Sequence, residues 1–359
     1  MNSQFALETY DYSFPPELLA REPAPVRSQS RFLDFSSGSL THRKFGDLAE
    51  VFKRPCLFVR NNTQVLKSKV KGRKLTGGRV EGLLYHRLED RLWEALLRPG
   101  RRLKRGDALD LVGGARCIIE KRLEHGSFLI RFEDCTDDLR YLEESGELPL
   151  PPYIRSFEGD LGRYQTVYAS QPGAAAAPTA GLHFDDDLLS ELARRGHRFA
   201  EVTLHVGPGT FKPIQTQDIR EFPIHQEWVE LGEASLKMIQ KARLEGTPVI
   251  AVGTTSLRVL ETGWRMNKLL KPFSGMTDLY IYPGQAIDSV DYLITNFHLP
   301  RTSLLVLCAA LIGPAPLSEL YQEALEKRYR LFSFGDAMCL PNWSKRLSHT
   351  EKQDLGPRS

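Results

Sequence analysis

The sequence predicts an α/β fold, in which helices cover a mainly parallel sheet (α/β/α) and a small β-barrel domain is inserted. From about residue 168 onward, segments of strand length alternate with segments of helix length, which is typical of parallel sheets. The earlier stretch 55–62 (PCLFVRNN) has the composition of one more buried strand. Because short, turn-bounded strands fill the space between these regions, we expect the barrel to interrupt the sheet.

The predicted barrel occupies roughly residues 65–134, where turn signals separate short strands at 79–88, 108–113, 115–123 and 127–134. Basic and apolar residues alternate in these strands, so one face should pack inward and the other should be positive. The proline-rich stretch 144–155 is expected to lead back to the first domain. The expected division is 1–62 and 153–342 for the α/β domain, 63–152 for the basic barrel and 343–359 for a loose polar tail.

The elements of the second half follow in a regular order. The segment 185–195 begins with acids, ends with arginines and precedes Gly196, which matches the helix dipole and a left-handed stop. Further helices are predicted at 234–246, 256–266 and 318–330, and strands at 201–206, 248–252, 278–283 and 291–297.

The composition favours a globular protein of a reducing compartment. The 359 residues suffice for two domains, and 41% hydrophobic with 26% charged residues is ordinary. Five scattered cysteines without a CxxC pair disfavour disulfide frameworks and zinc ribbons. The N-terminus lacks the features of a signal peptide, and the longest apolar run, 304–312, is too short for a membrane span. We therefore expect a cytoplasmic protein that does not bind a membrane.

The charge is distributed unevenly. The formal net charge is +3, yet residues 60–105 contain fourteen Lys and Arg against four acids. A basic block on a mildly acidic remainder indicates that a polyanion docks on one part of the molecule. The alternative is a solvated charged face.

Glycines and hydroxyl residues follow the predicted strands, where ligands bind in open α/β sheets. GTTS (253–256) opens a helix and offers N–H groups and hydroxyls to a phosphate or a carboxylate, although Thr255 or Ser256 could simply cap the helix. GPGTF (207–211) permits close backbone approach to a ligand, or forms a tight turn. The chain lacks GxGxxG, the Walker A lysine and the GxSxG elbow, which disfavours NAD, ATP and hydrolase-triad chemistry.

Four histidines lie in or beside the predicted strand-end loops: His183, His205, His225 and His298. One such histidine is more often structural, but four cases favour a shared site. Their spacing does not match a compact zinc motif. Glu227 follows His225 by two residues, so on a strand both would face one side, which suits acid–base catalysis near neutral pH.

Seven segments between Tyr10 and Leu340 resemble, in order, the motifs of the S-adenosylmethionine:tRNA ribosyltransferase-isomerases of queuosine biosynthesis. They are YDYSFPPELLAREPAPVRSQSRFL, TGGRVEGLL, YQTVYASQPGAAAAPTAGLHF, VTLHVGPGTF, VIAVGTTSLRVLET, YLITNFHLPRTSLL and YRLFSFGDAM. The resemblance implies an α/β/α domain with an inserted β-barrel. It also implies that the ribosyl group of S-adenosylmethionine is isomerised and transferred to 7-aminomethyl-7-deazaguanine at the tRNA wobble position. Epoxyqueuosine-tRNA, adenine and methionine would be the products, and no metal would be needed.

The resemblance also suggests roles for individual residues. Acid–base catalysis is expected from His183, His205, Glu227 and His298. Substrate binding is expected from Thr179, Gly181, Gly207, Gly209, Thr210, His225, Gly253, Thr254, Thr255, Ser256, Arg258, Asn296, Arg330 and Asp336, although Arg330 and Asp336 could instead form a structural ion pair. The GTTS segment and Arg258 would meet the donor carboxylate or an RNA phosphate. The tRNA anticodon stem-loop is expected on Lys67, Lys69, Lys71, Arg73, Lys74 and Arg79.

The chain departs from the usual family pattern at several positions. Asn62 and Gln64 replace an acid and an arginine, and further departures are Ser28, Pro208, Phe222 and Ile224. One alternative is therefore a divergent member that binds tRNA with reduced or no catalysis. Another is an unrelated α/β enzyme of free nucleotides, with the barrel as a dimer contact. In the main hypothesis no obligatory protein partner is needed, and we expect a monomer.

Overall fold

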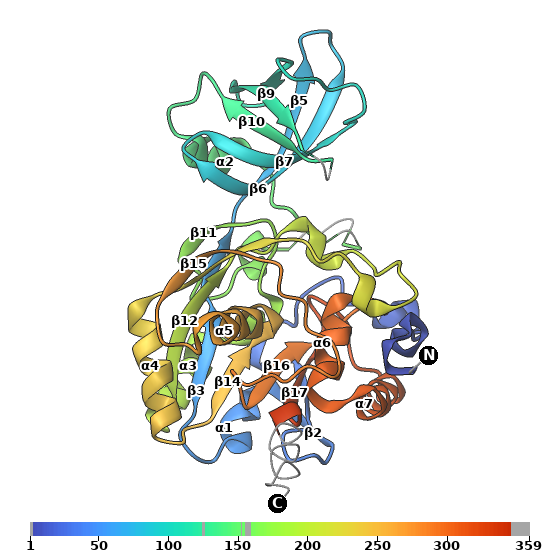
Figure 1. Cartoon of the computed structure of the whole chain (residues 1–359), viewed down its shortest axis with the longest axis vertical. Helices are drawn as coiled ribbons and strands as arrows, with labels where there is room; N and C mark the ends of the chain where they lie inside the picture. The colour runs from blue at the N-terminus through green and yellow to red at the C-terminus, as the bar shows by residue number, and fades with distance from the viewer. Residues whose placement is uncertain (1–2, 124–125, 152, 155–158, 346–359) are drawn as a thin grey trace, which may run out of the picture.

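The protein consists of a sheet covered by helices and a barrel connected to it by two chain segments (Figure 1). The computed structural model describes residues 3–123, 126–151, 153–154 and 159–345. The predicted α/β fold with an inserted β-barrel is confirmed.

The main sheet has parallel strands in its centre and antiparallel strands toward its edges. Its order is β15 (Phe273–Thr277), β13 (Glu227–Leu231), β12 (Arg198–Leu204), β3 (Leu57–Asn61), β14 (Val249–Val252), β16 (Tyr292–Asn296), β17 (Ala337–Pro341), β1 (Arg31–Asp34) and β2 (Thr41–Lys44). The four strands from β12 to β16 run parallel to one another. These central strands are apolar on both faces because helices cover both sides.

Alternate residues of β3 and β14 divide the core into two layers. Leu57 and Val59 pack with α4 (Glu233–Leu244), α5 (Gly253–Asn267), α6 (Ser303–Ile312) and α7 (Pro314–Glu326). Phe58 and Ile250 pack on the other face with α1 (Leu48–Val51) and α3 (Asp186–Arg194). The two layers hold the strands in place, so the loops at the carboxyl ends of the strands have a rigid base.

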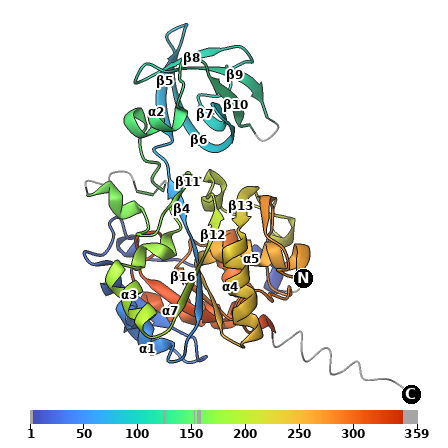
Figure 2. The same ribbon diagram turned by 90° about the vertical axis from the view of Figure 1, so that its left-hand side faces the viewer.

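The barrel closes in the order β10 (Phe128–Phe132), β7 (Leu92–Arg98), β6 (Arg79–Glu89), β5 (Lys69–Lys74), β8 (Ala108–Leu111) and β9 (Arg116–Arg122). Helix α2 (Asp138–Ser145) packs against it. The outgoing strand β4 (Thr63–Val65) pairs in parallel with β11 (Gln171–Ala174) below the barrel (Figure 2). The segment that leads into the barrel is therefore hydrogen-bonded to the segment that returns from it.

Some predicted elements differ from those in the structure. Residues 278–283 do not form a strand; β15 ends at Thr277, whose hydroxyl accepts a hydrogen bond from the Leu279 N–H. The helix predicted at 318–330 begins earlier and ends at Glu326. Strands β1 and β17 and helix α6 were not predicted. The tail predicted as loose starts with Trp343 packed on Phe35, and residues 346–359 lie outside the described part.

Among the described residues, no single helix is long and apolar enough to cross a membrane. Helices α6 and α7 pass that test of length and composition only as a pair, and the chain bends by 114° at the break between them. Helix α6 is almost entirely buried inside the protein.

Candidate active site at the strand ends

The carboxyl ends of the parallel strands surround a cavity. Its lining includes Val206 after β12, the start of α5 directly after β14, and residues 296–299 at the end of β16. Thr179, Thr210 and Tyr153 complete part of the wall. This position agrees with the general rule that open α/β sheets bind ligands beyond the carboxyl ends of their strands.

The amino end of α5 points its free backbone N–H groups toward this cavity. Gly253 has a φ of +88°, and the N-cap residue Val252 supplies no side-chain cap. Ser256 does not cap either, because its hydroxyl donates to the Val252 carbonyl at 2.7 Å. Thr254 and Thr255 line the cavity, and the buried Thr255 hydroxyl has no hydrogen-bond partner among the described residues. An uncapped helix start with an unpaired hydroxyl suits an anionic ligand group.

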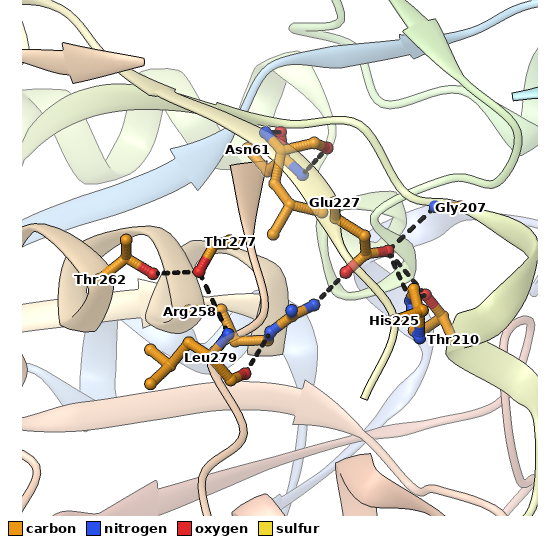
Figure 3. A network of polar contacts seen from close by, with 10 residues as sticks. Asn61, Gly207, Thr210, His225, Glu227, Arg258, Thr262, Thr277 and Leu279 are labelled. Carbon is orange, nitrogen blue, oxygen red and sulfur yellow. Dashed lines mark hydrogen bonds and ion pairs between the residues drawn. The ribbon is translucent and has the colours of Figure 1, made fainter. Parts of the chain in front are cut away.

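A buried network surrounds Glu227 at the start of β13 (Figure 3). Its Oε1 accepts hydrogen bonds from the Gly207 N–H at 2.9 Å and the Thr210 hydroxyl at 2.8 Å, and His225 Nε2 lies 3.3 Å away. Its Oε2 is paired with the guanidinium of Arg258. Burial raises the pKa of Glu227, but Arg258 and His225 lower it more, and the net pKa lies well below the ordinary carboxyl value.

Arg258 is held in place from two sides. Its Nε donates to the Leu279 carbonyl at 3.2 Å, and Leu279 is fixed through Thr277 (Figure 3). This use of the Leu279 backbone explains why the predicted strand at 278–283 is absent. Within the described part of the chain, the buried Arg258 Nη2 atom has no hydrogen-bond partner, and Arg258 lines a second cavity together with His225 and Tyr280.

His225 lies between the second cavity and Glu227. Its side chain is 25% exposed, lines the second cavity and is oriented by the buried Glu227 carboxylate. Gly209 packs against the ring so closely that an added Cβ would lie 2.4 Å from its Cγ. The GPGTF segment therefore approaches a histidine, and Gly207 reaches Glu227 through its N–H.

His183 is a buried histidine behind the cavity wall. Its ring stacks on Phe45, and its nitrogens bond Ser30 and Asn296. Burial lowers the pKa of His183 to about 3. The preceding Gly181 leaves room for Tyr168, whose hydroxyl would lie 2.1 Å from an added Cβ. The ring of His183 lines neither of these two cavities.

His205 and His298 have different surroundings. His205 stacks on Trp228 and bonds the Thr63 hydroxyl, and burial together with His86 of the barrel lowers its pKa to about 4. His298 lines the first cavity and bonds the Thr295 hydroxyl at 3.0 Å, and burial lowers its pKa to about 3. The four histidines are thus not brought to one point.

Asp336 and Arg330 have structural contacts. The Asp336 carboxylate accepts hydrogen bonds from the backbone N–H groups of Arg31 and Arg330, both at 2.8 Å. Burial raises the pKa of Asp336. The Arg330 guanidinium bonds the Glu22 carbonyl. Asp336 therefore ties β1 to the segment before β17 through backbone hydrogen bonds, and Arg330 is not paired with it as an ion.

The basic face of the barrel is partly neutralised. Lys67 pairs with Glu143, Lys69 and Lys71 lie near Glu147, and Lys74 pairs with Asp107. Arg73 and Arg79 are exposed, stand opposite each other on β5 and β6, and form no ion pair with any described residue. These two arginines are the members of the predicted set whose charge no described acidic side chain offsets.

The departures from the family pattern are accommodated locally. Asn62 forms hydrogen bonds with Glu201 and Thr203. Phe222 packs against Tyr280 with 5.9 Å between the ring centroids. Ile224 lines the second cavity. Pro208 begins a 3₁₀ turn, where its fixed φ is compatible with the backbone.

Sequence reasoning missed several residues near the cavities. Tyr153 and Tyr280 line them from distant parts of the chain, and Ser30 bonds His183 behind the cavity wall. Ser30 lies within a quoted motif and Tyr153 within the proline-rich stretch, but neither segment carries a strand-end signal. Within the described residues, no group of three or more His, Cys, Asp or Glu side chains is arranged to hold a metal ion.

Comparisons with known proteins agree with this architecture. A family model described as "Queuosine biosynthesis protein" matches residues 7–340. The S-adenosylmethionine:tRNA ribosyltransferase-isomerase of Gloeobacter violaceus is 44% identical over 337 residues, covering 94% of this chain and 96% of that protein. The protein of the same name from Thermotoga maritima is 41% identical over 333 residues, covering 92% of this chain and 98% of that protein. A crystal structure of a Thermotoga maritima S-adenosylmethionine tRNA ribosyltransferase shares 34% identity at a TM-score of 0.53, covering 92% of this chain and 99% of that one.

Proposed function

The chain belongs to the family of S-adenosylmethionine:tRNA ribosyltransferase-isomerases of queuosine biosynthesis, and we propose that it carries out this reaction. S-adenosylmethionine is the donor substrate. Its ribosyl group is isomerised and moved to the amine of 7-aminomethyl-7-deazaguanine at the tRNA wobble position. Adenine and methionine leave.

The uncapped amino end of α5 is the observation that carries the assignment of the donor site. It presents backbone N–H groups and the Thr255 hydroxyl, which no described residue bonds, and these groups fit the methionine carboxylate of the donor. Arg258 lies about one and a half turns further along the same helix. Because Glu227 already neutralises it, Arg258 contributes to this site by fixing the network rather than by attracting the anion.

The reaction needs acid–base groups. The donor sulfonium acidifies the adjacent ribose 5′-carbon, adenine leaves more readily once a ring nitrogen is protonated, and the acceptor amine must be neutral to attack. His225 is the best-supported candidate, since it combines partial exposure, a cavity position and a buried carboxylate partner. His298 is the second candidate because it lines the donor cavity. Glu227 orients His225 and keeps its own negative charge.

The tRNA would approach from the side of the barrel. Arg73 and Arg79 supply uncompensated charge for the phosphates of the anticodon stem-loop. Barrel strand β6 contacts β11, and Gly173 of β11 packs against the His205 ring, so this barrel strand lies on the same side as the end of β12. The target base would have to leave its stack to reach the cavity.

The decisive experiment incubates the protein with S-adenosylmethionine and a tRNA that carries the aminomethyl base, and measures released adenine. We expect adenine and modified tRNA in equal amounts. If adenine is not released but the tRNA is still bound, the alternative of a binding protein without catalysis is correct. If neither occurs, the proposed function is wrong.

A further inference from the structure

A continuous chain of hydrogen bonds runs from the protein interior to the donor cavity. Ser30 Oγ lies 2.7 Å from His183 Nδ1, and Asn296 Nδ2 lies 3.1 Å from His183 Nε2. Thr179 Oγ1 then donates to Asn296 Oδ1 at 2.9 Å. Ser30, His183 and Asn296 are at most 5% exposed, whereas Thr179 is partly exposed. Asn296 and Thr179 line the cavity.

The direction of these bonds follows from one contact. Ser30 Oγ donates to the Arg27 carbonyl at 3.0 Å, and a hydroxyl has only one hydrogen. His183 must therefore donate from Nδ1 to Ser30, which leaves Nε2 as the acceptor of an Asn296 N–H. This assignment also agrees with Asn296 Oδ1 accepting from Thr179. The network thus fixes both the tautomer of His183 and the orientation of the Asn296 amide.

We propose that His183 is a positioning residue that turns the Asn296 oxygen toward the cavity, where it and Thr179 Oγ1 accept a hydrogen bond from the bound donor. The group recognised is a neutral N–H or O–H, either a ribose hydroxyl or the exocyclic amine of adenine. This inference rests on the proposed function, and it replaces our expectation that His183 transfers protons.

The surroundings of the chain support a positioning role. The only acceptor nitrogen of His183 is engaged by Asn296, so the ring has no free atom for a substrate proton. Burial keeps the imidazole neutral, since it lowers the pKa of His183 to about 3. Apart from Tyr153, His298 is the only ionisable side chain among the described residues that line the cavity. A pair of neutral acceptor oxygens in such a wall suits an uncharged donor group.

The first test compares His183→Gln with His183→Leu at saturating tRNA. Glutamine carries an amide oxygen that can accept the Asn296 N–H in place of Nε2, whereas leucine cannot. We expect His183→Leu to raise KM for S-adenosylmethionine about 10–100-fold and His183→Gln to stay within about fivefold of the native value. His197→Gln is the matched control, because His197 is buried among Cys56 and Phe58 away from both cavities, and it should change only stability.

The result that would overturn the proposal is equal loss of kcat in both His183 variants with an unchanged KM, because only proton transfer by the imidazole predicts it. Native kinetics in a folded His183→Leu variant would overturn it as well. Circular dichroism and the urea midpoint establish that each variant is folded.

The second test identifies the recognised group. Competitive inhibition constants are measured for S-adenosylmethionine analogues that lack the 2′-hydroxyl, the 3′-hydroxyl or the 6-amino group, in the native protein and in Asn296→Ala. The analogue that lacks the recognised group should bind to the native protein about 10–100-fold more weakly than S-adenosylmethionine does. The Asn296→Ala substitution should not weaken the binding of that analogue further. If the affinity of every analogue relative to S-adenosylmethionine is the same in both proteins, Asn296 does not form a hydrogen bond with the donor.

These outcomes are separable from failure of the proposed function. That function fails when the native protein releases no adenine. The positioning role fails when adenine is released at native rates but the His183 and Asn296 variants behave differently from the pattern above.

Discussion

Glu227 is a charged carboxylate without access to water, and its stability depends on its partners. Arg258, Thr210 and the Gly207 N–H satisfy its two oxygens. Such a pair is costly to break because the remaining partner would be a buried, unpaired charge. At the scale of single residues, the stability of the fold therefore depends on the same carboxylate for which we propose a role in orienting His225.

Replacing Glu227 by glutamine should lower the free energy of unfolding by about 3–5 kcal/mol, because Arg258 would keep its charge in a buried position. The rate of adenine release should fall about 10²–10⁴-fold, since His225 would lose its orienting carboxylate. Urea denaturation and an adenine-release assay measure the two effects. Glu261→Gln is the matched control, since Glu261 is equally buried on α5 but bonds Arg265 and the Ser289 N–H. The Glu261→Gln variant should lose stability without a comparable loss of activity. A Glu227→Gln variant with full activity would contradict the role proposed for Glu227.

At the scale of elements, helix α5 connects the sheet to the cavity at the strand ends. It starts directly at the end of β14, so its amino end lies at the strand ends, and its first turn is left free of side-chain caps. Its later residues Arg258 and Glu261 are buried in networks that fix the helix to the sheet and its loops. The helix is thus held by its middle while its positive end stays available.

Gly253→Ala tests this arrangement, because alanine is strained at a φ of +88°. We expect a loss of about 1–2 kcal/mol in stability and a weaker affinity for S-adenosylmethionine, since the first turn of α5 would shift. Calorimetry in the presence of tRNA measures the affinity. Gly246→Ala provides the comparison: Gly246 also has positive φ, at +65°, but follows α4 with open space around it. Equal donor affinity in both variants would remove the α5 terminus from the binding site.

At the scale of the whole molecule, the barrel supplies charge and the sheet domain supplies the cavity. The segments that connect them, β4 and β11, pair with each other beside His205 and Thr63. RNA bound to the barrel would thus lie on the side of the sheet where the strands end.

RNA binding should be strongly salt-dependent, and the Arg73→Ala/Arg79→Ala double variant should reduce the slope of log K against log salt by about two. Fluorescence anisotropy with an anticodon stem-loop at several salt concentrations measures this slope. A Lys237→Ala/Lys241→Ala variant removes the same charge from the exposed face of α4 and should leave the slope unchanged. If both double variants reduce the slope equally, only net charge matters and the barrel is not the docking surface.

Stability should fall as the pH drops below about 6.5. Burial lowers the pKa of His183 and His298 to about 3 and of His205 to about 4, so the unfolded chain binds more protons than the native state between these values and about 6.5. Their stabilising contribution is complete above pH 6.5 and declines by about 1.4 kcal/mol per pH unit for each histidine below it. Urea midpoints between pH 5 and 8 test this. His183→Gln should make the decline shallower, and a flat profile in the native protein would show that these histidines are not buried as neutral groups.

The α/β class, the inserted barrel and the motifs that identify the family can be predicted from the sequence, because they depend on local patterns of apolar, turn and glycine residues. It also indicated the strand-end loops, where Gly253, Thr255 and Asn296 do line the cavity. The pattern at 278–283 was misleading because its backbone groups bond Thr277 and Arg258 rather than a neighbouring strand.

Which polar groups meet follows from the packing of distant segments and could not be predicted. His183 and His298 look alike in the sequence, but one is engaged by Ser30 and Asn296 and the other lines the cavity. Ser30 and His183 are separated by more than 150 positions, and Glu227 and Arg258 come from different elements. The chemical role of each group depends on its partners and its burial, and these are set by packing between distant segments rather than by local sequence.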